Sequence, residues 1–200
     1  MSAAGIASVA RILDFPCGYG RVLRLLKPAF PDAELAAGDI DREGVDFCAS
    51  AFGATPIYSH VDPGRVDLPP ESFDLIWCGS LLTHFEADRW DGFLSLLRDA
   101  LEPGGLLVFT THGPRDARTL LRFGMTDDQI PEMLGSLQRT GFAYADYAGQ
   151  SNWGIALARP EWTQARVAGI PGLRVVSYAE GGWDAPAPRQ DVVACVKARR

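Results

Sequence analysis

The sequence predicts an α/β protein built on an open, mostly parallel sheet. An apolar run that starts near Ala10 stops at Asp14, passes through a loop with two glycines and enters a helical pattern, an order typical of a strand, a ligand-binding loop and a helix. Strand-like and helix-like segments alternate up to about residue 110. Two β-rich segments near the C-terminal end, 173–179 and 191–198, are expected to close the sheet as an antiparallel hairpin.

The elements between these ends follow from the spacing of apolar residues. In chain order we expect a helix over 22–30, a strand over 35–39, a helix over 42–52 capped by Asp41, a strand and its exit over 57–62, a strand over 73–77, an amphipathic helix over 90–101 and a strand that ends near Phe109. Two further helices are expected over 127–140 and 160–168.

The glycine loop restricts the kind of ligand that the protein can bind. Gly18 and Gly20 let the backbone approach a ligand closely, because glycine has no Cβ and tolerates positive φ. The dinucleotide fingerprint needs a third glycine where Leu23 stands, and a phosphate-binding P-loop needs a lysine where Arg21 stands. Neither of these sites fits the loop. A glycine-rich turn without a ligand is the simpler alternative.

The loop resembles the first motif of class I S-adenosylmethionine-dependent methyltransferases, in which an acidic residue precedes three alternating glycines. Asp14 holds the acidic position, and Gly18 and Gly20 hold the second and third glycine positions. Pro16 replaces the first glycine, a departure that stiffens the loop. Later motifs in the same order, among them the Leu-Glu-Pro-Gly-Gly turn at 101–105, extend the resemblance over about residues 10–112.

The resemblance implies a Rossmann-like class I methyltransferase fold, with a mostly parallel seven-stranded sheet, and S-adenosylmethionine as the cofactor. It assigns Asp39, at the end of the second strand, to the cofactor ribose, and Asp62 to the adenine amino group, with Asp67 as the competing residue. A solvated aspartate in a turn is the alternative for Asp39. The implied cofactor-binding residues are Asp14, Pro16, Cys17, Gly18, Gly20, Asp39, Ile40, Asp62 and Gly79.

We expect a single methyltransferase domain over 1–200, with an inserted helical region over 113–168 that acts as a lid and reads the substrate. Insertions outside the carboxyl ends of the strands are where such sheets bind ligands. Tyr147, Asn152 and Trp153 lie in this insertion and are the candidate substrate-binding residues. A plain surface or core position is an equal alternative for each of them.

Methyl transfer to a hydroxyl or an amine benefits from a general base, and histidine suits that task near neutral pH. His112 follows the fifth strand and is the first candidate, and His84 follows the fourth strand and is the second. A loop or cap contact is the alternative for both. The expected reaction is methyl transfer to an oxygen or nitrogen of a small-molecule acceptor, such as a sugar or a secondary metabolite. A catalytically inactive binding subunit of the same fold and an NAD-dependent oxidoreductase are the alternatives.

The composition argues against several other classes of protein. A net charge of −6 without a basic stripe speaks against nucleic acid as the partner, and no run approaches the roughly 20 apolar residues of a membrane helix. The N-terminal residues lack the pattern of a signal peptide, so a cytoplasmic location is expected. The four cysteines show no metal-ligand spacing, and no metal site is expected. Because little chain precedes the first strand in this sequence, we expect another domain, a second copy or sequence beyond the given chain to cover that end of the protein.

Overall fold

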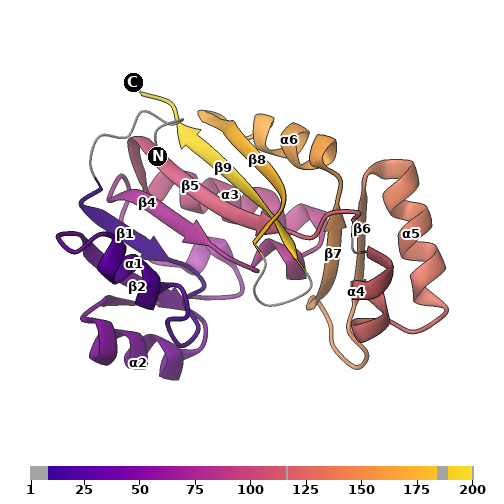
Figure 1. The fold of residues 1–200 in the computed structure, drawn as a ribbon, viewed down its shortest axis with the longest axis horizontal. Helices are drawn as coiled ribbons and strands as arrows, with labels where there is room; N and C mark the ends of the chain where they lie inside the picture. Colours follow the sequence, from indigo (N-terminus) through magenta and orange to yellow (C-terminus); the bar gives the residue numbers. More distant parts are fainter. Residues whose placement is uncertain (1–8, 116, 184–188, 200) are drawn as a thin grey trace.

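A seven-stranded sheet runs through the centre of the protein, in a computed structural model that describes residues 9–115, 117–183 and 189–199 (Figure 1). From one edge to the other the strands are β3 (Thr55–Tyr58), β2 (Glu34–Asp39), β1 (Arg11–Asp14), β4 (Phe73–Cys78), β5 (Leu101–Thr111), β9 (Gln190–Lys197) and β8 (Leu173–Trp183). All neighbours are parallel except where β9 pairs with β5 and β8. The predicted mostly parallel sheet with a C-terminal antiparallel hairpin is confirmed; residues 184–188 of the expected hairpin turn lie outside the described residues.

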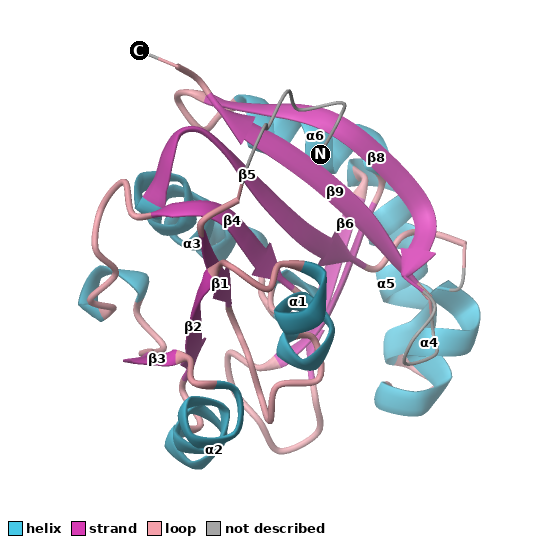
Figure 2. Ribbon diagram, turned by 60° about the vertical axis from the view of Figure 1, so that its left-hand side comes forward, coloured by secondary structure: helices cyan, strands magenta, loops and turns pink. Residues whose placement is uncertain are grey.

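Helices cover both faces of the sheet. α1 (Leu23–Ala29) and α2 (Arg42–Phe52) pack on one face, and α3 (Ala87–Ala100) and α6 (Pro160–Ala168) pack on the other (Figures 1 and 2). Successive strand residues point to opposite faces and so enter two separate cores: Ile12 packs with the α1 and α2 side, and Leu13 with the α3 and α6 side. The carboxyl ends of β1, β2 and β4 are left free of helices and meet at one edge.

The α2 helix has the limits that the sequence predicts, because both of its ends are capped. The Asp41 side chain accepts hydrogen bonds from the backbone N–H groups of Glu43 and Gly44, at 3.1 and 3.4 Å. Gly53 ends the helix with a φ of 70°, the left-handed conformation that glycine adopts without strain. The predicted Asp41 cap is therefore confirmed.

The segment between β5 and β8 forms a separate layer beside the sheet (Figure 1). It holds α4 (Ala117–Gly124), α5 (Gln129–Thr140) and an antiparallel pair, β6 (Phe142–Asp146) and β7 (Gly154–Ala158), around its own apolar cluster. The sequence pattern did not predict β6 and β7, because short apolar runs fit a buried helix as well as a strand. The helix predicted over 160–168 is α6, which packs against β8 of the main sheet and so lies outside this layer.

No helix among the described residues is long and apolar enough to span a membrane.

Two leucines test where the core lies. Leu97 on α3 is 0% exposed between the helix and the sheet, whereas Leu25 on α1 is 63% exposed. Leu97→Ala should lower the free energy of unfolding by about 2–5 kcal/mol, because it removes buried methyl groups and leaves a cavity. Leu25→Ala, the matched control, should stay within about 0.5 kcal/mol of the parent protein in urea unfolding. Equal losses for the two variants would contradict this position of the core.

Candidate functional site

Two adjoining cavities lie at the carboxyl ends of β1, β2 and β4. The larger has a volume of about 760 Å³ and the smaller of about 290 Å³. Pro16, Asp39 and Ser80 line both cavities, so the two form one continuous space. Open α/β sheets bind ligands at this edge, where neighbouring strands lead their loops in opposite directions.

The glycine loop over 15–20 is held to the end of β2 by one carboxylate. The nearly buried Asp39 accepts a hydrogen bond from the Gly18 N–H at 2.8 Å through one oxygen and from the Asp41 N–H at 3.0 Å through the other. Gly18 and Gly20 have φ values of 48° and 73°. A Cβ on Gly20 would lie 2.2 Å from the Phe52 ring, so position 20 has no room for a side chain, whereas a Cβ on Gly18 would meet nothing within 4 Å.

The smaller cavity lies between the glycine loop and the end of β4. Cys17 lines one side, and Gly79 lines the other beside the edge-to-face pair of Trp77 and Trp183, whose ring centroids are 5.4 Å apart. A Cβ on Gly79 would lie 2.6 Å from the Trp77 Nε1 atom. The central carbon of the Arg21 guanidinium lies 5.0 Å from the centroid of the Trp183 ring. Arg21 therefore places a positive charge in the lining of the smaller cavity. The sequence alone does not point to Trp183, because nothing local connects the hairpin with the glycine loop.

Asp14 lies underneath the glycine loop and is not among the residues that line either cavity. It is 1% exposed, and neither carboxylate oxygen makes a hydrogen bond of normal geometry. Burial raises the pKa of Asp14 to about 8; the Leu23 N–H opposes this shift, the nearby Asp39 charge adds to it and Arg21 opposes it. At pH 7 this carboxyl group therefore carries a proton.

One end of the larger cavity is flanked by two exposed apolar side chains. Ile40, which follows β2, is 57% exposed, and Val61, which follows β3, is 59% exposed. Exposed apolar side chains that face a cavity are typical of a binding surface. Asp62, the next residue, is not in the lining: its Oδ1 atom accepts a hydrogen bond from the Gly64 N–H at 2.9 Å and caps a short 3₁₀ turn, η2 (Pro63–Arg65).

The other end of the larger cavity brings together four of the residues that the sequence predicts for the site: His84, Tyr147, Asn152 and Trp153. His84 lies in a 3₁₀ turn, η3 (Leu82–His84), and its ring stacks on Trp153 with centroids 4.4 Å apart. The Tyr147 hydroxyl is 3.4 Å from His84 Nδ1. Asn152 also lines the cavity, with a φ of 59°. Trp153 and Tyr147 therefore contact His84, Asn152 lines the same cavity, and Tyr147 itself is not in the lining.

The protonation of His84 follows from its hydrogen bond. Its Nδ1 atom lies 2.9 Å from the Gly154 carbonyl oxygen, which can only accept, so Nδ1 carries the hydrogen and Nε2 keeps a free lone pair. Burial lowers the pKa of His84, and the bond to Gly154 opposes this shift. The ring is therefore neutral at pH 7 and can accept a proton at Nε2.

His112 is placed differently. It is 7% exposed, its carbonyl oxygen accepts a hydrogen bond from the Ala158 N–H of β7 at 2.9 Å, and it is not among the lining residues of either cavity. Burial lowers the pKa of His112 to about 4, and the charge of the His84 ring makes a smaller contribution in the same direction. The structure therefore brings the second candidate base to the cavity and leaves the first candidate behind it.

Ser80 stands where the two cavities join, and distant strands hold it there. Its φ is 60°, which is unfavourable for a residue with a side chain. The Ser80 N–H donates to Thr110 Oγ1 on β5 at 2.8 Å, and Gln190 Nε2 on β9 donates to Ser80 Oγ at 2.8 Å. This network cannot be recognised in the sequence, because Thr110 and Gln190 lie 30 and 110 residues from Ser80.

No group of three potential metal ligands comes together within the described ranges, 9–115, 117–183 and 189–199. The four cysteines are buried as free thiols, and burial raises the pKa of each.

Comparison with known proteins finds a family model described as a methyltransferase domain, which matches residues 12–105. A malonyl-[acyl-carrier protein] O-methyltransferase from Paenibacillus sp. (strain JDR-2) is 29% identical over an alignment of 116 residues, and the match covers 55% of this chain and 41% of that protein. A fatty-acid O-methyltransferase from Mycolicibacterium smegmatis is 26% identical over 106 residues, 52% of this chain and 38% of that protein. The chain thus spans about two fifths of the length of these relatives.

Among solved structures, a Burkholderia thailandensis 1,6-didemethyltoxoflavin-N1-methyltransferase with bound 1,6-didemethyltoxoflavin and S-adenosylhomocysteine superposes with a TM-score of 0.66. It is 14% identical and is matched over 98% of this chain and 77% of its own. At this identity the likeness establishes the fold.

The buried Asp14 makes stability depend on pH in an unusual direction. Between about pH 4 and pH 8 the Asp14 carboxyl group keeps its proton in the folded protein and loses it in the unfolded chain. The free energy of unfolding therefore falls as the pH rises through this range, by up to about 1.4 kcal/mol per pH unit. Asp14→Asn, which stays neutral, should flatten the dependence in urea unfolding between pH 5 and 8. The exposed Asp32→Asn serves as control. Equal slopes for the two variants would show that Asp14 is ionised in the folded state.

Proposed function

We propose that the chain is a class I S-adenosylmethionine-dependent methyltransferase that transfers a methyl group to an oxygen atom of a small-molecule acceptor, because a methyltransferase-domain model matches residues 12–105 and a solved methyltransferase shares the fold. The observation that carries the proposal is the pair of joined cavities, one at the glycine loop and one that holds a neutral imidazole. The names of the two curated relatives, both O-methyltransferases, support oxygen as the acceptor atom.

In this proposal the cofactor S-adenosylmethionine lies across both cavities. Its amino-acid part lies in the smaller cavity, where the glycine loop and Gly79 leave room beside the Arg21 cation. Its adenosine part lies in the larger cavity, between Ile40 and Val61. Asp39 faces both spaces, and each of its oxygens keeps a lone pair beyond its one backbone bond, which suits the two ribose hydroxyls. The residues present therefore fit this group.

When bound, S-adenosylmethionine supplies a methyl group on a positively charged sulfur, a good leaving group. The protein then has to align the acceptor with that methyl group and exclude water, which contributes up to about 7–11 kcal/mol to lowering the barrier. The acceptor would lie in the larger cavity against Trp153 and Phe85, next to the junction at Ser80. His84 Nε2 would accept the proton of an acceptor hydroxyl, an effect of about 10²–10⁴-fold on rate.

A carboxylic acid acceptor is the second candidate, because the relatives act on malonyl-[acyl-carrier protein] and on fatty acids, compounds that carry carboxyl groups. A carboxyl group with a pKa near 4 is already ionised at pH 7 and needs no base. His84 would then only pack against the acceptor. The sugar or secondary-metabolite acceptors suggested by the sequence remain predictions, and the effect of removing His84 separates a hydroxyl from a carboxylate.

Calorimetric titration with S-adenosylhomocysteine tests the cofactor site. The protein should bind it with a Kd below about 1 mM, and Asp39→Asn should weaken binding by about 10–100-fold, since bonds to a charged acceptor are worth about 1.5–3 kcal/mol each. Asp32→Asn, an exposed aspartate before β2, should leave the affinity unchanged. Folded protein that gives no heat up to millimolar ligand would overturn the proposal, and stabilisation by NAD(H) alone would favour the oxidoreductase.

Single-turnover assays on an acceptor found by screening test the base. For a hydroxyl acceptor, His84→Ala should lower the rate about 10²-fold or more, and His112→Ala should cost less than about threefold. The rate should be constant at neutral pH and fall on acidification through the pKa of His84, which lies below its ordinary value of 6.5, because protonated imidazole accepts no proton. A full rate for His84→Ala on a hydroxyl would exclude His84 as the base. A cofactor complex without transfer to any acceptor would favour the inactive binding subunit.

A further inference from the structure

Arg89, on the first turn of α3, joins the two ends of the larger cavity. Its Nη1 donates to the carbonyl oxygen of Asn152 at 2.9 Å, and its Nη2 donates to the carbonyl oxygen of Val61 at 3.0 Å. One planar group is thus bonded to the loop after β3 and to the loop between β6 and β7. These loops are about 90 residues apart in the sequence. Within the part of the chain that the structure describes, no direct hydrogen bond joins one loop to the other.

The Arg89 guanidinium is also held in place by the Phe85 ring. Its central carbon lies 3.7 Å from the centroid of the Phe85 ring, a cation–π stack that sets the plane of the fork. Arg89 forms no ion pair with a carboxylate within 4.0 Å among the described residues, so its two carbonyl contacts are its main polar bonds. Rigid, two-directional donation is a property of arginine that a lysine ammonium lacks.

Each loop held by Arg89 serves a different ligand under the proposed function. Val61 flanks the adenosine end, and Asn152 precedes Trp153, which stacks on His84 at the acceptor end. The Val61 loop is supported by α3 a second time, because a Cβ on Gly92 would lie 2.9 Å from Pro63. The Asn152 loop turns through a residue with a φ of 59° and is bonded across only a few positions, among them Gln150 N–H to the Tyr147 carbonyl.

We propose that Arg89 is a positioning residue that couples the acceptor wall of the cavity to occupation of the cofactor end. Adenosine bound between Ile40 and Val61 holds the Val61 loop still, Arg89 passes this restraint to the Asn152 carbonyl, and Trp153 is held against His84. The acceptor wall is then held more firmly once the cofactor is in place. The inference rests on the proposed function for the identity of the ligand, and it predicts that the cofactor slows hydrogen exchange at the acceptor wall.

Hydrogen–deuterium exchange of the whole chain, with and without S-adenosylhomocysteine, tests the coupling without a known acceptor. In the parent protein the ligand should slow exchange about fivefold or more both in the glycine loop, 16–20, and in the distant loop, 147–153. In Arg89→Met the ligand should still slow exchange at 16–20 and should no longer do so at 147–153. Arg89→Lys should behave like Arg89→Met, because the charge is kept and the two-directional fork is lost.

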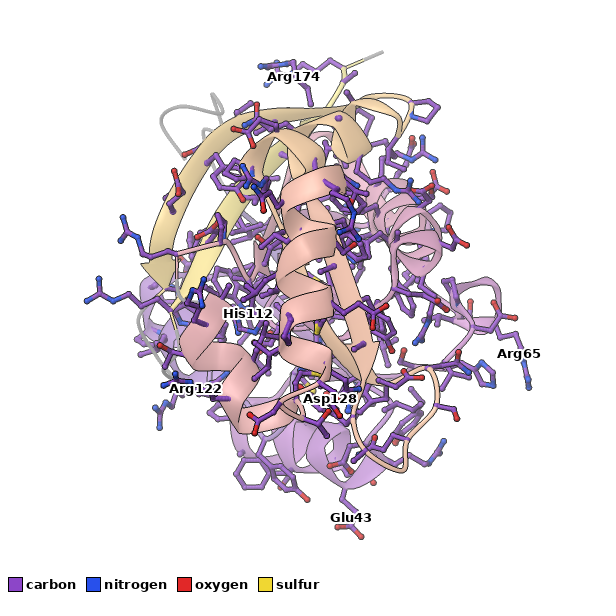
Figure 3. The ribbon with its side chains drawn as sticks, turned by 90° about the vertical axis from the view of Figure 1, so that its right-hand side faces the viewer. Glu43, Arg65, His112, Arg122, Asp128 and Arg174 are labelled. Atoms are coloured by element: carbon purple, nitrogen blue, oxygen red, sulfur yellow. The ribbon has the colours of Figure 1, made fainter. Side chains whose placement is uncertain are left out.

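Arg65→Met is the matched control, since Figure 3 shows Arg65 on the neighbouring turn pointing away from the protein. Unchanged exchange at 73–78 of β4 in every variant establishes that the fold is intact. Three results would overturn the coupling alone. In the first, the ligand still slows exchange at 147–153 in Arg89→Met, and in the second it does so in Arg89→Lys. In the third, the ligand slows exchange at 16–20 of the parent protein but not at 147–153. Absence of protection at both segments in the parent protein would overturn the proposed function and the coupling with it.

Discussion

The Asp39 carboxylate is the interaction on which the rest of the site depends. It is nearly buried at the end of β2, and it accepts one backbone hydrogen bond from the glycine loop and one from the start of the α2 connection. Because the loop leaves β1 and the connection leaves β2, this one side chain fixes the separation of two neighbouring strand exits. The larger and smaller cavities meet at that point, so their common boundary is set by a charged acceptor with two good donors.

The α3 helix supports the opposite side of the same site. Its apolar residues Phe93, Leu94 and Leu97 are buried against the sheet, which makes the helix a rigid base. Its first turn presents Arg89 to two loops, and Gly92 allows close contact with the turn after β3. Loops that carry binding residues have few stabilising contacts of their own, and here a packed helix supplies them.

The sequence was sufficient wherever the cause of a structure is local. Asp41 and Gly53 cap α2, so its limits could be read from the chain, and the glycine loop with Asp39 could be assigned because strand, turn and acidic residue follow in order. Trp183 and Ser80 could not be interpreted in this way, since their partners come from strands that are distant in sequence. The choice between His84 and His112 also lies beyond sequence patterns, because both follow strands at the same edge and only three-dimensional packing buries one of them behind the other.

The hydrogen bond from Gln190 to Ser80 bears on how the protein is made. β9 lies between β5 and β8, although it follows both of them in the sequence and leaves the ribosome after them. A nascent chain that ends before Gln190 has the glycine loop and Asp39 but lacks a partner that holds Ser80 in its strained conformation. Domains generally fold as units during synthesis, and in this one the insertion of a late strand between two earlier ones completes the ligand site. A ligand that needs both cavities would therefore bind chains that include β9 in preference to chains that stop before it.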